Sequence, residues 1–380
     1  MILSEEHQLI RDSVRDFARE RLWPTAGLRD ETHAFPHDEL AMAAELGLLG
    51  LTVPTDWDGA GLDYLAAALA IEELAAGDGA FSTIVSVHNS VGCGPVLAFG
   101  TEAQKEQYLK KLASGRWLAS FCLTEPQVGS DAGAIKTRAV RDGDHYVLNG
   151  AKQFITNGKN GHVSIVIAVT DPAAGKKGLS AFIVPTDTPG YTVSRIEKKL
   201  GQAASDTCAI VLDDCRVPAA NLLGAEGMGY KVALASLESG RIGIAAQAVG
   251  MARSAYECAL QYSKERETFG KPIIEHQAVA FRLAEMATQL EAARQLIWHA
   301  ATLKDAGLPC LKEASMAKLF ASEIAERVCS DAIQIHGGYG YLNDFPVERI
   351  YRDVRVCQIY EGTSDIQKIV IGRAIAAEIM

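Results

Sequence analysis

The stretch from Val279 to Ile297, VAFRLAEMATQLEAARQLI, carries an apolar residue at every third or fourth position. This spacing puts the apolar side chains on one face of an α-helix, which is typical of helix-bundle packing. The face consists of Val279, Leu283, Met286, Leu290, Ala293 and Ile297. Similar patterns predict helices over 312–335 and 363–378, so we expect a four-helix bundle domain over residues 226–380.

Helix signals also fill the N-terminal zone, which is expected to form an α-helical domain over residues 1–116. Ser4 can cap a first helix, and Trp23-Pro24 is expected to end it, because a residue before proline disfavours the helical conformation. Further helices are predicted at 37–48, 64–76, 81–98 and 102–113.

Between these zones, residues 117–225 show β-rich runs separated by Gly, Pro and Asp. Tyr146–Leu148 and Lys152–Ile155 are predicted to pair through a tight turn at Asn149-Gly150, a dipeptide typical of two-residue hairpins. Further strands are predicted at 163–169, 179–184 and 207–212. The expected fold class is therefore α+β but mostly α, with a small antiparallel barrel or sandwich between two helical domains.

Composition limits the classes of function. The net charge of −10 and the absence of a basic stripe argue against nucleic-acid binding. The longest strongly apolar stretch, Val163–Val169, is far shorter than the roughly 20 residues of a membrane helix, so no membrane span is expected. The N-terminus carries acidic residues where a targeting peptide would carry basic ones, so we expect a cytoplasmic protein.

The cysteines, histidines and glycines argue against a metal site and a nicotinamide cofactor. The eight cysteines contain no C-x-x-C pair, so neither a disulfide framework nor a zinc site is expected. His33 and His37 have a helical spacing, but Pro36 between them favours loop histidines. No G-x-G-x-x-G motif follows a predicted strand and opens a helix, so a Rossmann domain is not expected.

Two segments of the central zone place polar groups beside glycine or an aromatic ring. Residues 121–131, FCLTEPQVGSD, run from an apolar strand into a loop whose backbone amides can face a ligand, although a surface turn has the same composition. Phe154 and Thr156 lie two apart, so both point to one strand face and can contact a flat heteroaromatic ring. A plain core position for Phe154 is the alternative.

Two further segments lie in the C-terminal zone. The run Glu238–Arg241 and Arg266 supply guanidinium groups that suit phosphate, although solvated surface arginines are common. Glu361 comes just before a predicted helix and follows apolar neighbours. A half-buried carboxylate has the raised pKa that a general base needs near neutral pH, whereas most glutamates are simply solvated.

In this order, the segments resemble the acyl-CoA dehydrogenase family over essentially the whole chain. Each motif is weak alone, but the ordered set is specific. The set consists of Thr124-Glu125-Pro126 with Gly129-Ser130-Asp131, Ile155-Thr156-Asn157, Arg266 with Thr268-Phe269-Gly270, Gln334 with Gly337-Gly338, and Ile359 to Ser364. The stretch from Ser239 to Gln247 is most similar to the short-chain, butyryl-CoA branch.

This resemblance implies a homotetramer, a dimer of dimers, with FAD held between the β domain, the bundle and a neighbouring subunit. The residues implied to contact FAD are Phe121, Leu123, Thr124, Gly129, Ser130, Phe154, Ile155, Thr156, Arg266, Thr268, Phe269, Gln277, Gln334, Ile335, His336, Gly337, Gly338, Thr363, Ser364 and Asp365. The residues implied to contact acyl-CoA are Ser130, Glu238, Ser239, Gly240, Arg241, Tyr360, Gly362 and Arg373.

The resemblance also implies α,β-dehydrogenation of a short acyl-CoA, as in fatty acid β-oxidation, with electrons passed to an electron-transfer flavoprotein. Glu361 takes the pro-R α-proton while the β-hydrogen leaves as hydride. Phe154 replaces the tryptophan of many members, and Glu238 replaces the more usual aspartate. Some branches place the base just before the arginine that matches Arg241. That position is Gly240 here, which leaves Glu361 as the candidate.

Three alternatives stay open. A branched short substrate, such as isobutyryl-CoA or 2-methylbutyryl-CoA, would use the same fold and the same base. An acyl-CoA oxidase-like enzyme would pass its electrons to oxygen, although its chain is usually far longer. A catalytically silent binding or assembly protein would have lost Glu361 or the flavin loop, and both are present.

Overall fold

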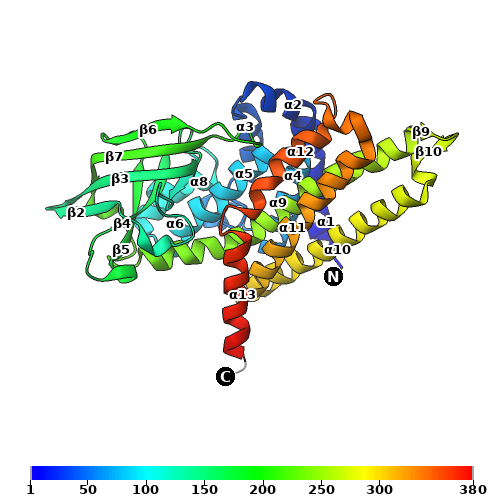
Figure 1. The fold of residues 1–380 in the computed structure, drawn as a ribbon. Helices are drawn as coiled ribbons and strands as arrows, with labels where there is room; N and C mark the ends of the chain where they lie inside the picture. The colour runs from blue at the N-terminus through cyan, green and yellow to red at the C-terminus, as the bar shows by residue number, and fades with distance from the viewer. Residues whose placement is uncertain (1, 379–380) are drawn as a thin grey trace.

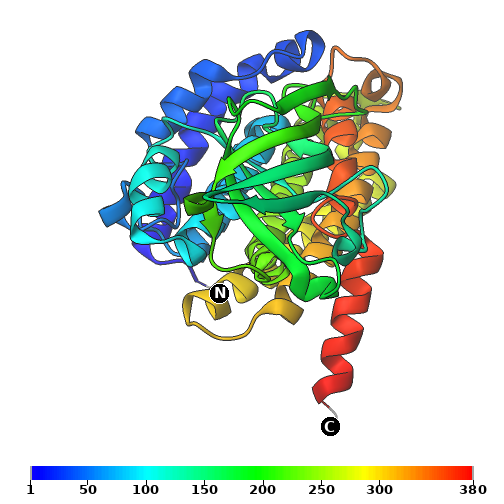
Figure 2. The ribbon, with the colours of Figure 1, turned by 90° about the vertical axis from the view of Figure 1, so that its left-hand side faces the viewer.

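The computed structural model describes residues 2–378 and shows a β-sheet at one end of an otherwise helical molecule (Figure 1). Turned by a quarter, the sheet faces the viewer and covers the helices behind it (Figure 2). The order along the chain is helices, then the sheet, then helices again, as the sequence predicts. The last helix, α13, stands out from the body in both views.

The first helix, α1 (Glu5–Phe17), begins as predicted, because the Ser4 hydroxyl accepts an amide hydrogen from its first turn. The predicted end at Trp23-Pro24 is wrong. A π-helical segment, Ala18–Leu22, leads directly into α2 (Trp23–Thr32). Pro24 lies in the first turn of α2, where a missing N–H and a fixed φ are tolerated.

The other predicted N-terminal helices are confirmed, although two of them are interrupted by π-helical segments. Their bounds are α3 (His37–Glu45), α4 (Tyr64–Gly77), α5 (Gly79–Val87), π segment His88–Cys93, α6 (Gly94–Phe99), α7 (Glu102–Gln104), π segment Lys105–Leu109 and α8 (Lys110–Ala113). The helix α4 is apolar on nearly all sides, and it is buried because it packs on α1, α5 and the C-terminal bundle.

The sheet runs in the order β6-β7-β3-β2-β4-β5-β8, and β1 pairs with β4 outside this path. It does not close into a barrel. Most neighbours are antiparallel, as expected, but β1 and β2 each run parallel to β4, so the sheet is mixed. The strands are β1 (Ala119–Cys122), β2 (Arg138–Asp142), β3 (His145–Thr156), β4 (Val163–Val169), β5 (Leu179–Pro185), β6 (Tyr191–Ile196), β7 (Thr207–Pro218) and β8 (Leu222–Leu223).

The predicted hairpin turn at Asn149-Gly150 is wrong, because both residues lie inside the single strand β3. The chain reverses earlier, between β2 and β3. Gly150 lies at an irregular point of the β3–β7 ladder, and a Cβ there would come within 2.5 Å of the Thr137 hydroxyl oxygen. Close approach of a neighbouring segment therefore explains this glycine, not a turn.

Three long helices form the C-terminal bundle, and the apolar face predicted on the second of them is confirmed: Leu283 to Ile297 of that face are buried. The helix α12 packs on α9 and α11, whereas α13 contacts α11. The bounds are α9 (Gly229–Glu265), hairpin strands β9 (Glu267–Thr268) and β10 (Lys271–Pro272), α10 (Gln277–Asp305), α11 (Leu311–His336), α12 (Pro346–Val354) and α13 (Ser364–Glu378).

None of the helices in residues 2–378 has the length and apolar character needed to cross a bilayer. Those residues contain no group of three or more His, Cys, Asp or Glu side chains arranged to hold a metal ion. All eight cysteines are free thiols, and seven of them are buried, as expected for small core residues.

Candidate active site

Glu361 lies in the short link between the turn Arg355–Gln358 and α13. Its backbone has φ of 50°, in the left-handed region that non-glycine residues rarely adopt, and Gly362 follows with φ of 91°. The Thr363 hydroxyl accepts from the Ile366 amide and so caps α13. This backbone turns the Glu361 side chain away from α13 and toward α9.

The Glu361 carboxylate is pressed against α9 at Gly240. An added Cβ at Gly240 would lie 1.9 Å from the Glu361 Oε2, well inside van der Waals contact. Both carboxylate oxygens are inaccessible to solvent, and neither has a hydrogen-bond partner among the described residues. Gly240 thus makes room for this carboxylate, and the absence of partners leaves both oxygens free to accept a proton.

The surroundings of Glu361 adjust its acidity. Burial raises the pKa of Glu361 to about 7, and the nearby cations Lys318 and Arg241 oppose that rise. Arg241 is itself buried, and its Nε and Nη1 have no partner in the described structure. A carboxyl group with a pKa near 7 can take a proton at neutral pH, which is what a general base must do.

Behind Glu361, a chain of buried side chains connects three parts of the fold. The Tyr360 hydroxyl donates to Gln247 Oε1 on α9 at 2.7 Å. The amide of Gln247 donates to Thr83 on α5, and Thr83 donates to Gln202 at 2.7 Å in the link between β6 and β7. This network fixes the Tyr360 ring beside the base and fills the space two helical turns along α9 from Gly240.

The sheet contributes a second group of predicted residues. The backbone carbonyl of Thr124 accepts a hydrogen bond of 2.9 Å from the backbone amide of Gln153, so the loop after β1 lies beside β3. Phe154 is 64% exposed with φ of 59°, whereas Ile155 is buried, because the β3–β7 register shifts at this point. An exposed ring at a strand irregularity fits a flat partner such as a flavin. The core position considered for Phe154 is ruled out.

The loop that carries Gly129 and Ser130 is exposed and is held at its base by a buried ion pair. Lys152 Nζ lies 2.9 Å from Glu125 Oε1, and both side chains are almost completely buried. Glu125 also accepts from the backbone amides of residues 136 and 137. Each oxygen of this carboxylate is satisfied, so the pair fixes the loop and is not available for chemistry.

Asn157 connects this part of the sheet to the helices. Its side-chain amide donates to the carbonyls of Ala119 on β1 and Ile84 on α5. Ile84 is adjacent to Thr83 of the network behind Tyr360. The end of β3, with Thr156, is therefore attached to the same helix that supports the Glu361 link.

A third group of predicted residues lies far from Glu361 within one chain. The β9–β10 hairpin is at the opposite end of the molecule from the sheet (Figure 1). Phe269 at its tip is 96% exposed, and Arg266 and Gln277 flank it on the surface. Nearby, Gln334, Gly337 and Gly338 are exposed, whereas Ile335 and His336 point into the core. A single chain does not bring this group together with Phe154 or Glu361.

The remaining predicted contacts vary in position. Glu238 pairs with Lys304 of α10 at 3.2 Å and accepts from the Cys310 thiol, so it faces α10. Leu123 is buried, and Phe121 is partly buried. Asp365 and Arg373 are exposed on α13, and the buried hydroxyl of Ser364 has no partner in residues 2–378.

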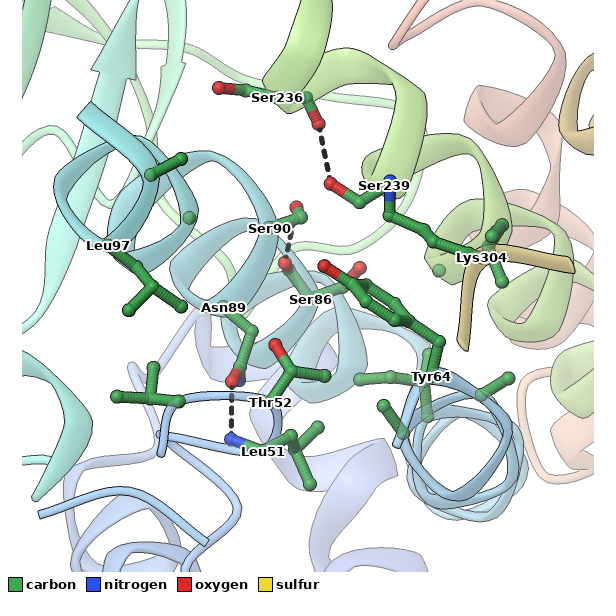
Figure 3. A pocket seen from close by; sticks show the side chains of 18 of the residues that line it. Leu51, Thr52, Tyr64, Ser86, Asn89, Ser90, Leu97, Ser236, Ser239 and Lys304 are labelled. Carbon is green, nitrogen blue, oxygen red and sulfur yellow. Dashed lines mark hydrogen bonds between the residues drawn. The ribbon is translucent and has the colours of Figure 1, made fainter. Parts of the chain in front are cut away.

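A cavity of about 250 Å³ lies between α4, the α5–α6 region and α9 (Figure 3). Its wall is mostly apolar, and Tyr64, Ser239 and Lys304 place polar groups around it. Ser239 is thus the predicted substrate contact that borders a cavity. Glu361 does not line it, so we do not assign the reaction to this cavity.

Three residues that support the site are missing from the list of predicted contacts: Lys318, Gln367 and Asn157. Lys318 is completely buried on a face of α11 that otherwise carries small residues, alanines and serines, and Gln367 is completely buried on α13. A lysine or glutamine on an apolar helix face was the available signal, since such groups are buried only with partners.

Comparison with known proteins identifies the family of this chain. Sequence models of the acyl-CoA dehydrogenase N-terminal, middle and C-terminal domains match residues 4–116, 120–215 and 227–376. The short-chain specific acyl-CoA dehydrogenase of Rattus norvegicus mitochondria is 48% identical over 97% of this chain and 90% of its own.

Solved structures give the same result. Butyryl-CoA dehydrogenase from Megasphaera elsdenii superposes with a TM-score of 0.97 at 42% identity, covering 99% of each chain. A chain in a structure of the electron-transferring flavoprotein of Acidaminococcus fermentans also superposes with a TM-score of 0.97. It is 46% identical, and the match covers 99% of each chain. The chain is an oxidoreductase and belongs to the acyl-CoA dehydrogenase family.

Proposed function

We propose that this enzyme uses FAD to remove two hydrogens from a short-chain acyl-CoA, forming the trans-2-enoyl-CoA, with Glu361 as the base. The observation that carries the proposal is the Glu361 carboxylate, which is buried, has no partner and is held against Gly240. A structural carboxylate in such a place would be paired, because an unpaired buried charge is costly. A base awaiting a C–H proton has to be free.

The residues of the chain have three roles in this reaction: they accept the α-proton, polarise the thioester carbonyl and contact the flavin. Glu361 accepts the α-proton, and its backbone amide polarises the thioester carbonyl by donating a hydrogen bond, as in the family. FAD, when bound, supplies the acceptor for the β-hydrogen and its electron pair. Phe154 and Thr156 provide a ring face and a hydroxyl for the flavin, next to the loop at Thr124.

Two arguments support a short acyl chain. The mitochondrial short-chain relative and the butyryl-CoA dehydrogenase are both more than 40% identical to this chain. In addition, the hydrogen-bonded side chains of Tyr360, Gln247 and Thr83 fill the space along α9 beyond Glu361. A longer acyl tail entering there would have to break buried hydrogen bonds, which is unfavourable.

For the electron acceptor we propose an electron-transfer flavoprotein, because a close structural relative comes from a structure of such a protein. For the assembly we propose a homotetramer in the cytoplasm, in which the β9–β10 hairpin and residues 334–338 serve the FAD of a neighbouring subunit. Their separation from Phe154 within one chain supports this assignment.

The experiment is an anaerobic titration of purified, FAD-loaded protein with straight and branched acyl-CoAs, following the loss of flavin absorbance. Butyryl-CoA should bleach the flavin fastest. Protein that stays colourless after reconstitution with FAD would contradict the cofactor assignment. Faster bleaching by isobutyryl-CoA or 2-methylbutyryl-CoA would assign the enzyme to branched substrates, and rapid reoxidation of the reduced flavin by oxygen would indicate an oxidase.

A further inference from the structure

Lys318 on α11 is a buried cation directly beside the base. Its side chain has no exposed surface, and its Nζ donates to the Gly362 carbonyl at 2.7 Å. No carboxylate oxygen of residues 2–378 lies within ion-pair distance of this Nζ. A lysine buried in this way costs free energy, so its presence requires an explanation.

The hydrogen bond from Lys318 acts on an unusual backbone. Glu361 and Gly362 both have positive φ, and Gly362 is next to the residue whose side chain must be aimed. The Gly362 carbonyl accepts a second hydrogen bond, from Gln367 Nε2 at 2.8 Å, and Gln367 also reaches the Glu361 carbonyl at 3.3 Å. Two side chains from different helices therefore hold the turn that directs Glu361.

The charge of Lys318 matters as well as its hydrogen bond. The charged or titratable groups that face it are Glu361, Arg241 from α9 and the Cys357 thiol. Burial lowers the pKa of Lys318 to about 8, so it is largely protonated at neutral pH. Of the two cations near Glu361, Lys318 has the larger effect in opposing the rise of the Glu361 pKa.

We propose that Lys318 is the positioning residue for the base: it holds the Glu361–Gly362 turn through the Gly362 carbonyl, and its ammonium group favours the ionised form of the buried Glu361 carboxylate. The proposal rests on the proposed function of Glu361. It assigns to α11 control over the pH range in which the enzyme works.

The test compares Lys318→Met with Gln367→Met in FAD-loaded enzyme. Each change removes one hydrogen bond to the Gly362 carbonyl, and Gln367→Met also removes the longer one to the Glu361 carbonyl, but only Lys318→Met removes a charge. The rate of flavin reduction at saturating butyryl-CoA is measured across pH, so that the profile reports the enzyme–substrate complex. Because a neighbouring cation lowers a carboxyl pKa, Lys318→Met should move the acidic limb upward by about one pH unit.

At pH values below the midpoint of the acidic limb, flavin reduction in Lys318→Met should therefore be about tenfold slower than in wild type, with little change in substrate affinity. Gln367→Met should be slower at every pH but keep the limb in its wild-type position. Lys318→Gln, which restores a donor without charge, should recover rate at high pH while its limb stays shifted. A Lys318→Met profile that coincides with wild type would overturn the proposal.

Two other outcomes are informative. If Lys318→Met and Lys318→Gln both fail to fold or to bind FAD, whereas Gln367→Met is normal, Lys318 is a structural residue and the proposal is wrong. If Glu361→Gln still reduces its flavin, the proposed function itself fails. Loss of reduction in Glu361→Gln together with an unshifted Lys318→Met profile would reject the role of Lys318 alone.

Discussion

At the level of single residues, Glu361 combines two features that a structural glutamate avoids. Its backbone is in the left-handed region, and its carboxylate is buried without a partner. Strained backbone and unsatisfied buried groups cost free energy, and they tend to gather at functional sites. Their coincidence on one residue is the reason for assigning the chemistry to Glu361.

Glu361→Gln should bind FAD and acyl-CoA almost normally but fail to reduce the flavin with substrate. The amide keeps the shape of the side chain and removes the proton acceptor. General base catalysis typically contributes a factor of about 10²–10⁴ to the rate. Stopped-flow bleaching measures the effect. Glu238→Gln is the control, because Glu238 faces Lys304; it should mainly raise KM. A Glu361→Gln enzyme that bleaches within about threefold of wild type would mean that the base lies elsewhere.

Gly240→Ala tests the contact between α9 and the base. The new methyl group would lie 1.9 Å from the carboxylate oxygen, so Glu361 has to move by more than an ångström. A displacement of that size can cost about 100-fold in rate, and we expect such a loss in kcat with FAD still bound. Gly372→Ala on α13, where nothing lies within 4 Å, is the matched control and should retain activity.

At the level of elements, α9 organises the site, because one helix carries Gly240 and Arg241 on one turn and Gln247 two turns further along. The Glu361 link and the sheet approach this helix from different directions. A change at Gln247 can therefore alter the space that we propose for the acyl tail without disturbing the contact between Gly240 and the base.

Gln247→Ala should move the substrate preference toward longer chains. The change removes the partner of the Tyr360 hydroxyl and opens space along α9. Each additional methylene buried there contributes about 0.8 kcal/mol, or about fourfold in kcat/KM. Kinetics with butyryl-, hexanoyl- and octanoyl-CoA provide the measurement, and an unchanged order of preference would show that the acyl tail runs elsewhere.

Periodicity predicted the elements wherever one face of a helix or strand is apolar. The face of α10 is the example: its buried residues follow the predicted spacing to Ile297. Local turn signals were less reliable. Asn149-Gly150 looks like a hairpin turn, but strand pairing with β7 and close packing on Thr137 decided its conformation. Similarly, α2 tolerates Pro24 because this proline lies in the first turn of the helix.

The site was predictable only where motif residues carry it. Glu361 and Gly240 are adjacent in space, and a separation of 121 positions in the sequence does not reveal that contact. Lys318 could not be assigned a partner from sequence, because its hydrogen bond is to a backbone carbonyl. Backbone acceptors leave no residue-type signal, so such contacts become visible only in the fold.

At the level of the whole molecule, large apolar and aromatic side chains are exposed at the end that lies opposite the sheet. We expect a neighbouring subunit to bury them. Phe269 is 96% exposed and Tyr341 86%, which is unusual for large apolar or aromatic groups of one region. We expect a homotetramer, with a mass by light scattering of four times the 40.7 kDa of one chain. A monomer that retains FAD would contradict the assignment of this end to a neighbouring subunit.

The distance between the β9–β10 hairpin and the Glu361 link also has a genetic consequence (Figure 1). If each reaction centre draws on two polypeptides, two inactive alleles can restore one another. A mixed dimer of Glu361→Gln and Arg266→Gln chains contains one centre with both defects and one with neither. Co-expression of the two should therefore return up to half of the wild-type turnover per mixed dimer, whereas centres built within single chains would stay inactive in every combination.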